Sequence, residues 1–152
     1  MTDAPEIRDI AVEVVLPQPP PIVWRTLTIS ELIGRWLMAN DFSAVVGKKF
    51  MFRTGPIGDW DGLVDCEIVE IVENRRLVYR WKAGLARSGG RGSRLDTLVA
   101  WTLAPTEGGT KLTMLQSGFQ LPENQVAYDA MNPGWGQVMR RLERVVEQEG
   151  RA

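Results

Sequence analysis

The stretch GLVDCEIVEIVENRRLVYRW, residues 62–81, contains two β-strand patterns separated by a turn at residues 73–75. A second pair of strand patterns follows in LVAWTLAPTEGGTKLTMLQSGF, residues 98–119, and an amphipathic helix in GWGQVMRRLERVVEQ, residues 134–148. Alternating apolar residues are typical of half-buried strands, and helical spacing of apolar residues is typical of a helix with one buried face. A long antiparallel sheet that meets one long helix has to curl around it. We therefore predict a ligand cavity between the sheet and this helix.

The N-terminal part predicts one strand and two short helices. Alternating apolar residues over 7–16 predict the first strand. The proline-rich segment 17–21 ends this strand and favours the first turn of a helix over 21–29. Ser30 is predicted to cap a second short helix over 31–38.

Further patterns complete the predicted order of elements. Residues 43–53 predict the second strand, and a change of apolar phase at Val69 predicts a bulge in the third. The glycine-rich segment 83–92 is predicted to be a mobile loop between two strands, in a position that also permits a lid. The Asn-Pro pair at 132–133 predicts either the start of the C-terminal helix or a kink that joins it to a preceding helical segment, 123–131.

Composition narrows the class of protein. A chain of 152 residues predicts a single domain over 1–152, with loose tails at 1–5 and 149–152. A net charge of −1 does not favour nucleic acid or anionic membranes, and no apolar stretch is long enough to span a bilayer. One cysteine and an N-terminus without signal-peptide features indicate the cytoplasm. Fourteen Arg against four Lys indicates a GC-rich bacterial genome.

The absence of histidine excludes several kinds of catalytic site. Ser-His-Asp and Cys-His nucleophile systems cannot be built, and neither can the usual zinc sites. Acid–base chemistry would fall to Asp, Glu, Tyr or Lys. We therefore expect no metal, no cofactor and no catalytic residues of these kinds, and favour binding over catalysis.

Several segments, in this order, resemble the helix-grip fold of the START/Bet v 1-like superfamily, often called SRPBCC. They are PIVWRTLT with LIGRWL (21–28 and 32–37), the two strand pairs quoted above, and Gly134-Trp135 before the terminal helix. The branch they resemble is related to the C-terminal domain of the activator of the Hsp-ninety ATPase. The resemblance implies an α+β fold, in which a curved antiparallel sheet of about six strands wraps around a long C-terminal helix, with two short helices after the first strand.

Large side chains on the inward faces of these elements are the candidate cavity residues. Tyr79, Gln116 and Tyr128 are polar groups that could orient a ligand. For each residue the alternative is that it simply fills the core, and Gln116 either bonds a neighbour such as Tyr79 or meets a ligand. The full set is Trp36, Phe50, Phe52, Tyr79, Trp81, Trp101, Met114, Gln116, Met131, Trp135 and Met139.

Other polar motifs are interpreted as surface. The acidic residues around Trp60 (Asp59, Asp61, Asp65 and Glu67) match no ordered calcium loop. The arginines of segment 87–94 lack interleaved aromatic residues, and those of segment 140–144 alternate with glutamate. Cys66 is predicted to be a buried, inert thiol.

Three functions remain open, because fold alone does not imply function. The first is binding of a small hydrophobic molecule between the sheet and the C-terminal helix. The second is an enzyme of the polyketide cyclase or aromatase kind, with a Tyr or carboxylate as acid–base group. The third is a stress-response or co-chaperone-like module with a chaperone as partner. The sequence does not define the oligomeric state.

Overall fold

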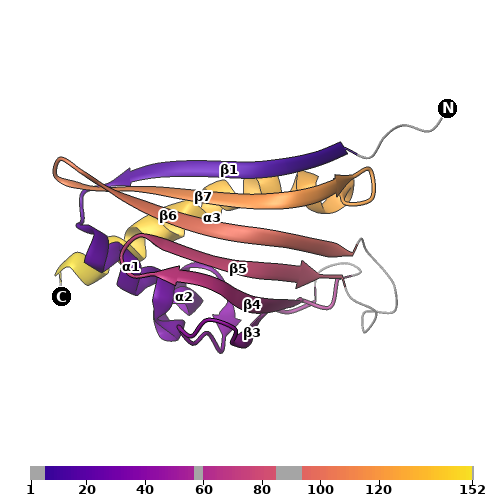
Figure 1. Ribbon diagram of the computed structural model, residues 1–152, viewed down its shortest axis with the longest axis horizontal. Helices are drawn as coiled ribbons and strands as arrows, with labels where there is room; N and C mark the ends of the chain where they lie inside the picture. The colour runs from indigo at the N-terminus through magenta and orange to yellow at the C-terminus, as the bar shows by residue number, and fades with distance from the viewer. Residues whose placement is uncertain (1–5, 57–59, 85–93, 152) are drawn as a thin grey trace.

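The computed structural model describes residues 6–56, 60–84 and 94–151. It is an α+β structure in which seven antiparallel strands curl around a long C-terminal helix (Figure 1). In chain order the elements are β1 Glu6–Leu16, α1 Pro20–Thr28, α2 Ser30–Trp36, β2 Ala39–Asn40, β3 Lys49–Arg53, β4 Leu63–Val72, β5 Arg76–Ala83, β6 Leu95–Thr106, β7 Gly109–Leu121 and α3 Gln125–Arg151. No helix in these described ranges is long and apolar enough to cross a membrane.

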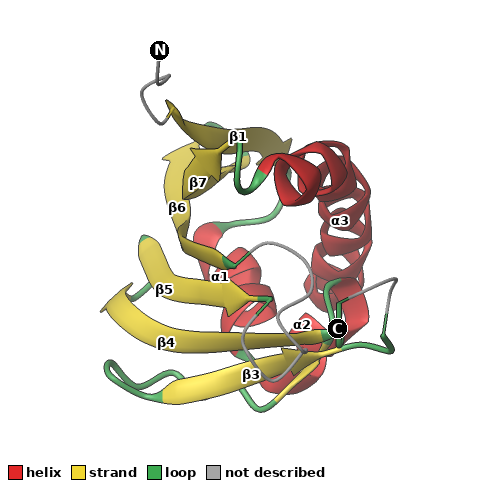
Figure 2. Ribbon diagram, turned by 90° about the vertical axis from the view of Figure 1, so that its right-hand side faces the viewer, coloured by secondary structure: helices red, strands yellow, loops and turns green. Residues whose placement is uncertain are grey.

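The strand order is β1-β7-β6-β5-β4-β3-β2. Consecutive strands from β3 to β7 are neighbours, and β1 closes the sheet beside β7. All three helices lie on the inner side of the curved sheet, and α3 runs opposite its strands (Figure 2). This arrangement places the core, and the candidate site, between α3 and the inner face.

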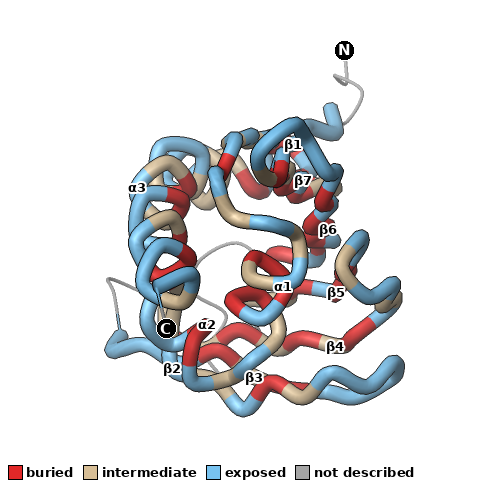
Figure 3. Tube along the Cα trace, turned by 90° about the vertical axis from the view of Figure 1, so that its left-hand side faces the viewer, coloured by how far each residue is buried: buried red, intermediate tan, exposed pale blue. Residues whose placement is uncertain are grey.

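The inner face follows the alternation seen in the sequence. On β5 the residues Leu77, Tyr79 and Trp81 are buried, and on β6 Val99 and Trp101 are completely shielded from solvent. The buried residues of α3 are Trp135, Met139, Leu142, Val145 and Val146, at helical spacing. Figure 3 shows that the buried side of α3 faces the inside of the molecule and that its other side is exposed. The predicted inward faces are therefore confirmed.

A bulge in β4 is confirmed at the predicted position. The pairing of β4 with β5 shifts register between Ile68 and Glu70, so Val69 has no partner in that ladder. An extra residue in one strand increases its local twist and reverses which side chains face inward. This explains why Val64, Cys66 and Ile68 are buried while the following apolar residues are partly exposed.

Two predictions about the N-terminal half were wrong. Ser30 does not cap α2: its hydroxyl donates to the backbone and side-chain oxygens of Asn40, at 3.0 and 2.8 Å, which ties α2 to β2. The strand predicted over 43–53 is shorter and begins at Lys49, because a turn at residues 46–47 precedes it and the backbones of Gly47 and Lys48 bond Ile68 of β4. The two-residue strand β2 was not predicted, since two residues carry no periodic signal.

The C-terminal helix is longer than the Asn-Pro pair alone predicts. It begins at Gln125, contains Pro133 in its interior, and continues through Arg151. The alternative in which segment 123–131 joins the helix is therefore the correct one. The last turn is not a loose tail, because Glu149 is paired with Arg25 of α1 at 3.2 Å and lies 4.0 Å from Arg35 of α2.

Candidate functional site

The predicted cavity residues come together on the inner side of the sheet. Ten of the eleven are buried, and Met131 near the start of α3 is half-buried. They come from every layer that faces α3: Trp36 from α2, Phe50 and Phe52 from β3, Tyr79 and Trp81 from β5, Trp101 from β6, Met114 and Gln116 from β7, and Met131, Trp135 and Met139 from α3 itself.

Aromatic rings form a continuous row through this interior. Trp36 meets Trp101 edge to face, with ring centroids 5.4 Å apart. Trp135 of α3 lies 5.9 Å from Trp101 and 6.0 Å from Trp81. Trp81 continues the row to Phe52 at 5.3 Å. Each such pair contributes about 0.5–1.5 kcal/mol beyond its buried area, so the row joins α2, β6, α3, β5 and β3.

The backbone of α3 does not contact all strands of the sheet equally. It approaches β1 and β7 at one side and α1 and α2 at the other. The indole of Trp135 bridges from the helix to Trp81 of β5 and Trp101 of β6. The sheet curls around α3 (Figure 2), and the rings of Trp81, Trp101 and Trp135 lie between the helix and the central strands.

A buried chain of hydrogen bonds crosses the same layer. The Trp135 indole N–H donates to Gln116 Oε1 at 2.9 Å, and the Gln116 Nε2 donates to Thr97 Oγ1 at 2.9 Å. The Thr97 hydroxyl donates to the backbone oxygen of Trp81 at 3.2 Å. An indole can only donate and a carbonyl can only accept, so these ends determine the direction of every bond and the orientation of the amide. The partners of Gln116 are thus Thr97 and Trp135, not Tyr79.

Tyr79 carries the other interior hydroxyl. It is 2% exposed, and its oxygen accepts the Trp101 indole N–H at 3.0 Å. Burial raises the pKa of the Tyr79 phenol well above its usual value, and the Trp101 hydrogen bond offsets only part of that effect. The phenol is therefore neutral at physiological pH and acts as a hydrogen-bonding group rather than as a base.

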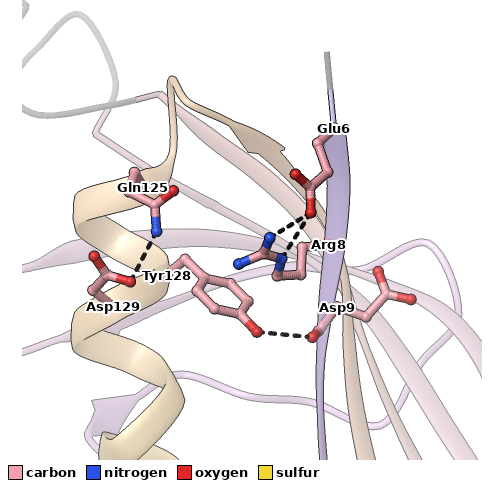
Figure 4. Close-up of polar contacts among 6 residues, drawn as sticks. All are labelled: Glu6, Arg8, Asp9, Gln125, Tyr128 and Asp129. Carbon is pink, nitrogen blue, oxygen red and sulfur yellow. Dashed lines mark hydrogen bonds and ion pairs between the residues drawn. The ribbon is translucent and has the colours of Figure 1, made fainter. Parts of the chain in front are cut away.

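Tyr128 lies at the rim, with its hydroxyl directed at Asp9 (Figure 4), while its ring packs edge to face on Phe119 of the core at 5.3 Å. Its hydroxyl donates to the backbone oxygen of Asp9 in β1 at 3.4 Å. The Arg8 guanidinium lies over its ring, 5.4 Å from the centroid, and is itself paired with Glu6. Tyr128 thus attaches the first turn of α3 to the edge strand, and we do not retain it as a ligand-orienting residue.

Two residues of this interior were not singled out from the sequence. Thr97 is 2% exposed and shares the inward phase of Val99 and Trp101, so the alternation in β6 could have identified it. Phe42 is 6% exposed and meets Phe50 edge to face at 5.1 Å. It lies between β2 and β3, where no periodic pattern marks it.

An open concavity of about 470 Å³ lies on the outer face of β3, β4 and β5, away from α3. Opposite charges face each other across its strands: Lys49 is opposite Glu67, and Asp65 is opposite Lys82. No group of three or more acidic, Cys or His side chains suited to a metal occurs within the described ranges. The lining residues are Asp41, Lys49, Phe50, Met51, Asp65, Cys66, Glu67, Arg80 and Lys82.

The remaining sequence motifs, as far as the structure describes them, contribute no reactive group to the interior. Cys66 is buried, and burial raises the pKa of its thiol well above its usual value, in agreement with an inert side chain. The three arginines of segment 140–144 are exposed, as predicted. Asp59 and residues 85–92 of the loop predicted over 83–92 lie outside the described residues, whereas Ala83 is the last residue of β5.

Comparison with known proteins agrees with this architecture. Residues 17–147 match the family model described as Activator of Hsp90 ATPase homolog 1-like protein. The crystal structure of protein MLL2253 from Mesorhizobium loti is 37% identical, covers 93% of this chain and 98% of its own, and superposes with a TM-score of 0.80. No protein with a curated description matches the chain.

Two further solved structures share the fold. DynU16, a protein of the dynemicin biosynthetic locus, is 26% identical with a TM-score of 0.73; the match covers 91% of this chain and 47% of that one. The Aha1 dimer from Colwellia psychrerythraea is 17% identical with a TM-score of 0.74, over 92% of this chain and 96% of that one. The family match over 17–147 and the relative at 37% identity show that this chain belongs to the Activator of Hsp90 ATPase homolog 1-like family and has its helix-grip, SRPBCC-type fold.

Proposed function

We propose that this protein binds a small, largely apolar molecule between α3 and the central strands of the sheet. The main supporting observation concerns the contact between α3 and the central strands. The backbone of α3 packs on β1, β7, α1 and α2, whereas its contact with β5 and β6 is made by the Trp135 side chain, which meets Trp81 and Trp101. A ligand can occupy a space that is filled by a few large side chains when one of these side chains changes its rotamer. Aromatic and Met-rich surfaces of this kind are typical of adaptable ligand sites.

The energetics favour an aromatic ligand. A ligand that buries ~200 Å² of apolar surface gains about 5 kcal/mol before the cost of association. Displacing Trp135 costs its two ring contacts and its hydrogen bond to Gln116. A flat ring that stacks on Trp81 and Trp101 in its place restores the ring contacts, so it competes better than an aliphatic chain of equal area.

Intrinsic tryptophan fluorescence and thermal unfolding test this proposal. Naphthalene derivatives should raise the melting temperature in a concentration-dependent way and quench the interior tryptophans. Trp135→Phe shortens the bridging side chain and should increase the affinity for a naphthalene-sized probe several-fold. Trp24→Phe is the matched control, because Trp24 is buried on α1 but contacts none of the described aromatic rings. Wild-type protein that no aromatic probe stabilises refutes the proposal.

A second candidate is chaperone binding, which the family description favours. On this protein the outer concavity of β3–β5 is the surface we propose for it, because its alternating charges around Met51 suit a polar protein partner. Charge reversal of Arg80 and Lys82 should abolish any stimulation of an Hsp90-class ATPase, whereas reversal of the exposed Arg140 on α3 should not. Absence of stimulation by the wild-type chain rejects this candidate.

The cyclase alternative has less support. The buried polar side chains of the described residues are Thr26, Thr97, Thr110, Gln116 and Asn124, with no carboxylate among them. Tyr79 is the interior phenol, and its raised pKa makes it a poor base.

A further inference from the structure

The Tyr79 hydroxyl uses only its accepting capacity in the hydrogen bond that the structure gives it. Because the Trp101 indole can only donate, the contact of 3.0 Å between the two side chains uses the Tyr79 oxygen as acceptor. The hydrogen of the Tyr79 hydroxyl must therefore point elsewhere. Within the described ranges no acceptor accompanies it.

The surroundings of Tyr79 provide apolar contacts instead. The ring lies 5.4 Å from Phe50 and 6.1 Å from Phe52, both at tilted or edge-on angles. Its raised pKa keeps the hydrogen on the oxygen. A buried donor without an acceptor costs about 1–3 kcal/mol, so supplying one is favourable.

Gln116 and Thr97 do not offer the same opportunity. The Gln116 amide is already bonded at both ends, to Trp135 through its oxygen and to Thr97 through one of its two N–H groups, and the Thr97 hydroxyl in turn donates to the backbone oxygen of Trp81. A ligand acceptor at that position would meet only the second N–H of an amide whose orientation two other hydrogen bonds already determine. At Tyr79 it would break no hydrogen bond among the described residues.

We propose that the Tyr79 hydroxyl selects, among apolar ligands, those that carry a hydrogen-bond acceptor such as a ketone, ester or ether oxygen. This inference rests on the proposed function and names the class of ligand for the same site. The apolar body of the ligand lies among the rings of the aromatic row, and its oxygen accepts the Tyr79 hydrogen. The Trp101 N–H supports the geometry from behind, because it holds the phenol oxygen in place.

A pair of probes that differ at one position tests this selectivity. 2-Acetylnaphthalene carries a carbonyl oxygen where 2-isopropenylnaphthalene carries a CH₂ group, and the two have nearly the same shape. Their dissociation constants are measured by tryptophan quenching, and the ratio of hydrocarbon to ketone is compared between proteins. Tyr79→Phe should lower this ratio about tenfold relative to wild type, the size of one hydrogen bond. Tyr128→Phe makes the same chemical change at the rim, where the hydroxyl is bonded to Asp9, and should leave the ratio unchanged.

The Phe variant also frees the Trp101 N–H, so a second measurement is needed. The infrared carbonyl stretch of bound 2-acetylnaphthalene should lie at a lower frequency in wild type than in Tyr79→Phe. An unchanged ratio, or a carbonyl stretch that stays low in the variant, assigns the contact to another donor and overturns the inference. If neither probe binds the wild-type protein, the proposed function itself fails. Binding of both probes with an unchanged ratio refutes the selectivity alone.

Discussion

Replacing Gln116 by Met tests whether the buried polar chain holds α3 against the sheet. The change keeps the length of the side chain but removes the acceptor of the Trp135 N–H and the donor to Thr97. Both partners are almost fully buried, at 3% and 2% exposure, so water cannot replace the lost contacts. Each buried polar group left without a partner costs about 1–3 kcal/mol. Part of this cost is offset, because Met has no amide group that must be desolvated on folding. We expect a loss of about 2 kcal/mol in the free energy of unfolding, or about 6 °C in melting temperature.

Urea denaturation followed by fluorescence and circular dichroism measures this loss. The slope of the free energy with urea should stay constant, which shows that the native state alone has changed. In a Trp135→Phe background the donor is already gone, so Gln116→Met should cost at least ~1 kcal/mol less than in wild type. A neutral or stabilising Gln116→Met, or effects that simply add in the double variant, would refute the reasoning.

Three further predictions concern the backbone, an ion pair and the response to alkali. Gly109→Ala should lower the free energy of unfolding in urea by more than ~2 kcal/mol, because the new Cβ would lie 1.9 Å from the backbone oxygen of Leu16. The control Gly108→Ala places its Cβ in open space and should cost only about 1 kcal/mol, because the backbone φ of Gly108 is positive. Glu149→Gln should cost about 0.5–1 kcal/mol at low ionic strength and less in 1 M salt, since it breaks pairs with α1 and α2 whose arginines are half exposed. The raised pKa values of Cys66 and Tyr79 mean that the unfolded chain loses these protons first, so the contribution of the two groups to stability should be complete below about pH 9 and fall above it. Tyr79→Phe should flatten that fall in urea unfolding, and an equally steep fall in the variant contradicts the assignment.

Much of the fold could be predicted from local patterns. The strands β4 to β7 alternate apolar and polar residues, and this determines which side faces inward without knowledge of the partner strand. The change of phase at Val69 identified a bulge, because only an extra residue can reverse the alternation within one strand. The patterns failed where an element is very short, as in β2, or where a side chain has a distant alternative partner, as when Ser30 bonds Asn40 instead of capping α2.

The candidate site was predicted in its residues but not in its contacts. Inward phase and side-chain size were enough to select Trp81, Trp101 and Trp135, because both properties are local. The hydrogen-bond partners of Gln116 lie nineteen positions away in the chain, one on β6 and one on α3. Which of several inward polar groups meet depends on register and on the position of the helix, and neither is encoded in a single segment.

The outer concavity is a further case in which local pattern was insufficient. The sequence places Asp65 and Glu67 on the polar face of a strand, and the structure agrees. That they face Lys82 and Arg80 across the ladder follows only from the pairing of β4 with β5. The concavity is lined by residues of three strands together, which no single segment indicates.

The amino-acid sequence by itself determined the order of the elements, their inward faces and the exclusion of histidine-based catalysis. Periodicity is a property of neighbouring residues, so it indicates which side of an element is buried before the partner element is known. The tertiary structure alone decided that Trp135 reaches from α3 to the central strands, that Gln116 bonds Trp135 and Thr97, and that the hydrogen of Tyr79 is left without an acceptor among the described residues. These depend on how far a curled sheet holds its helix away, a distance set by all the packed side chains at once.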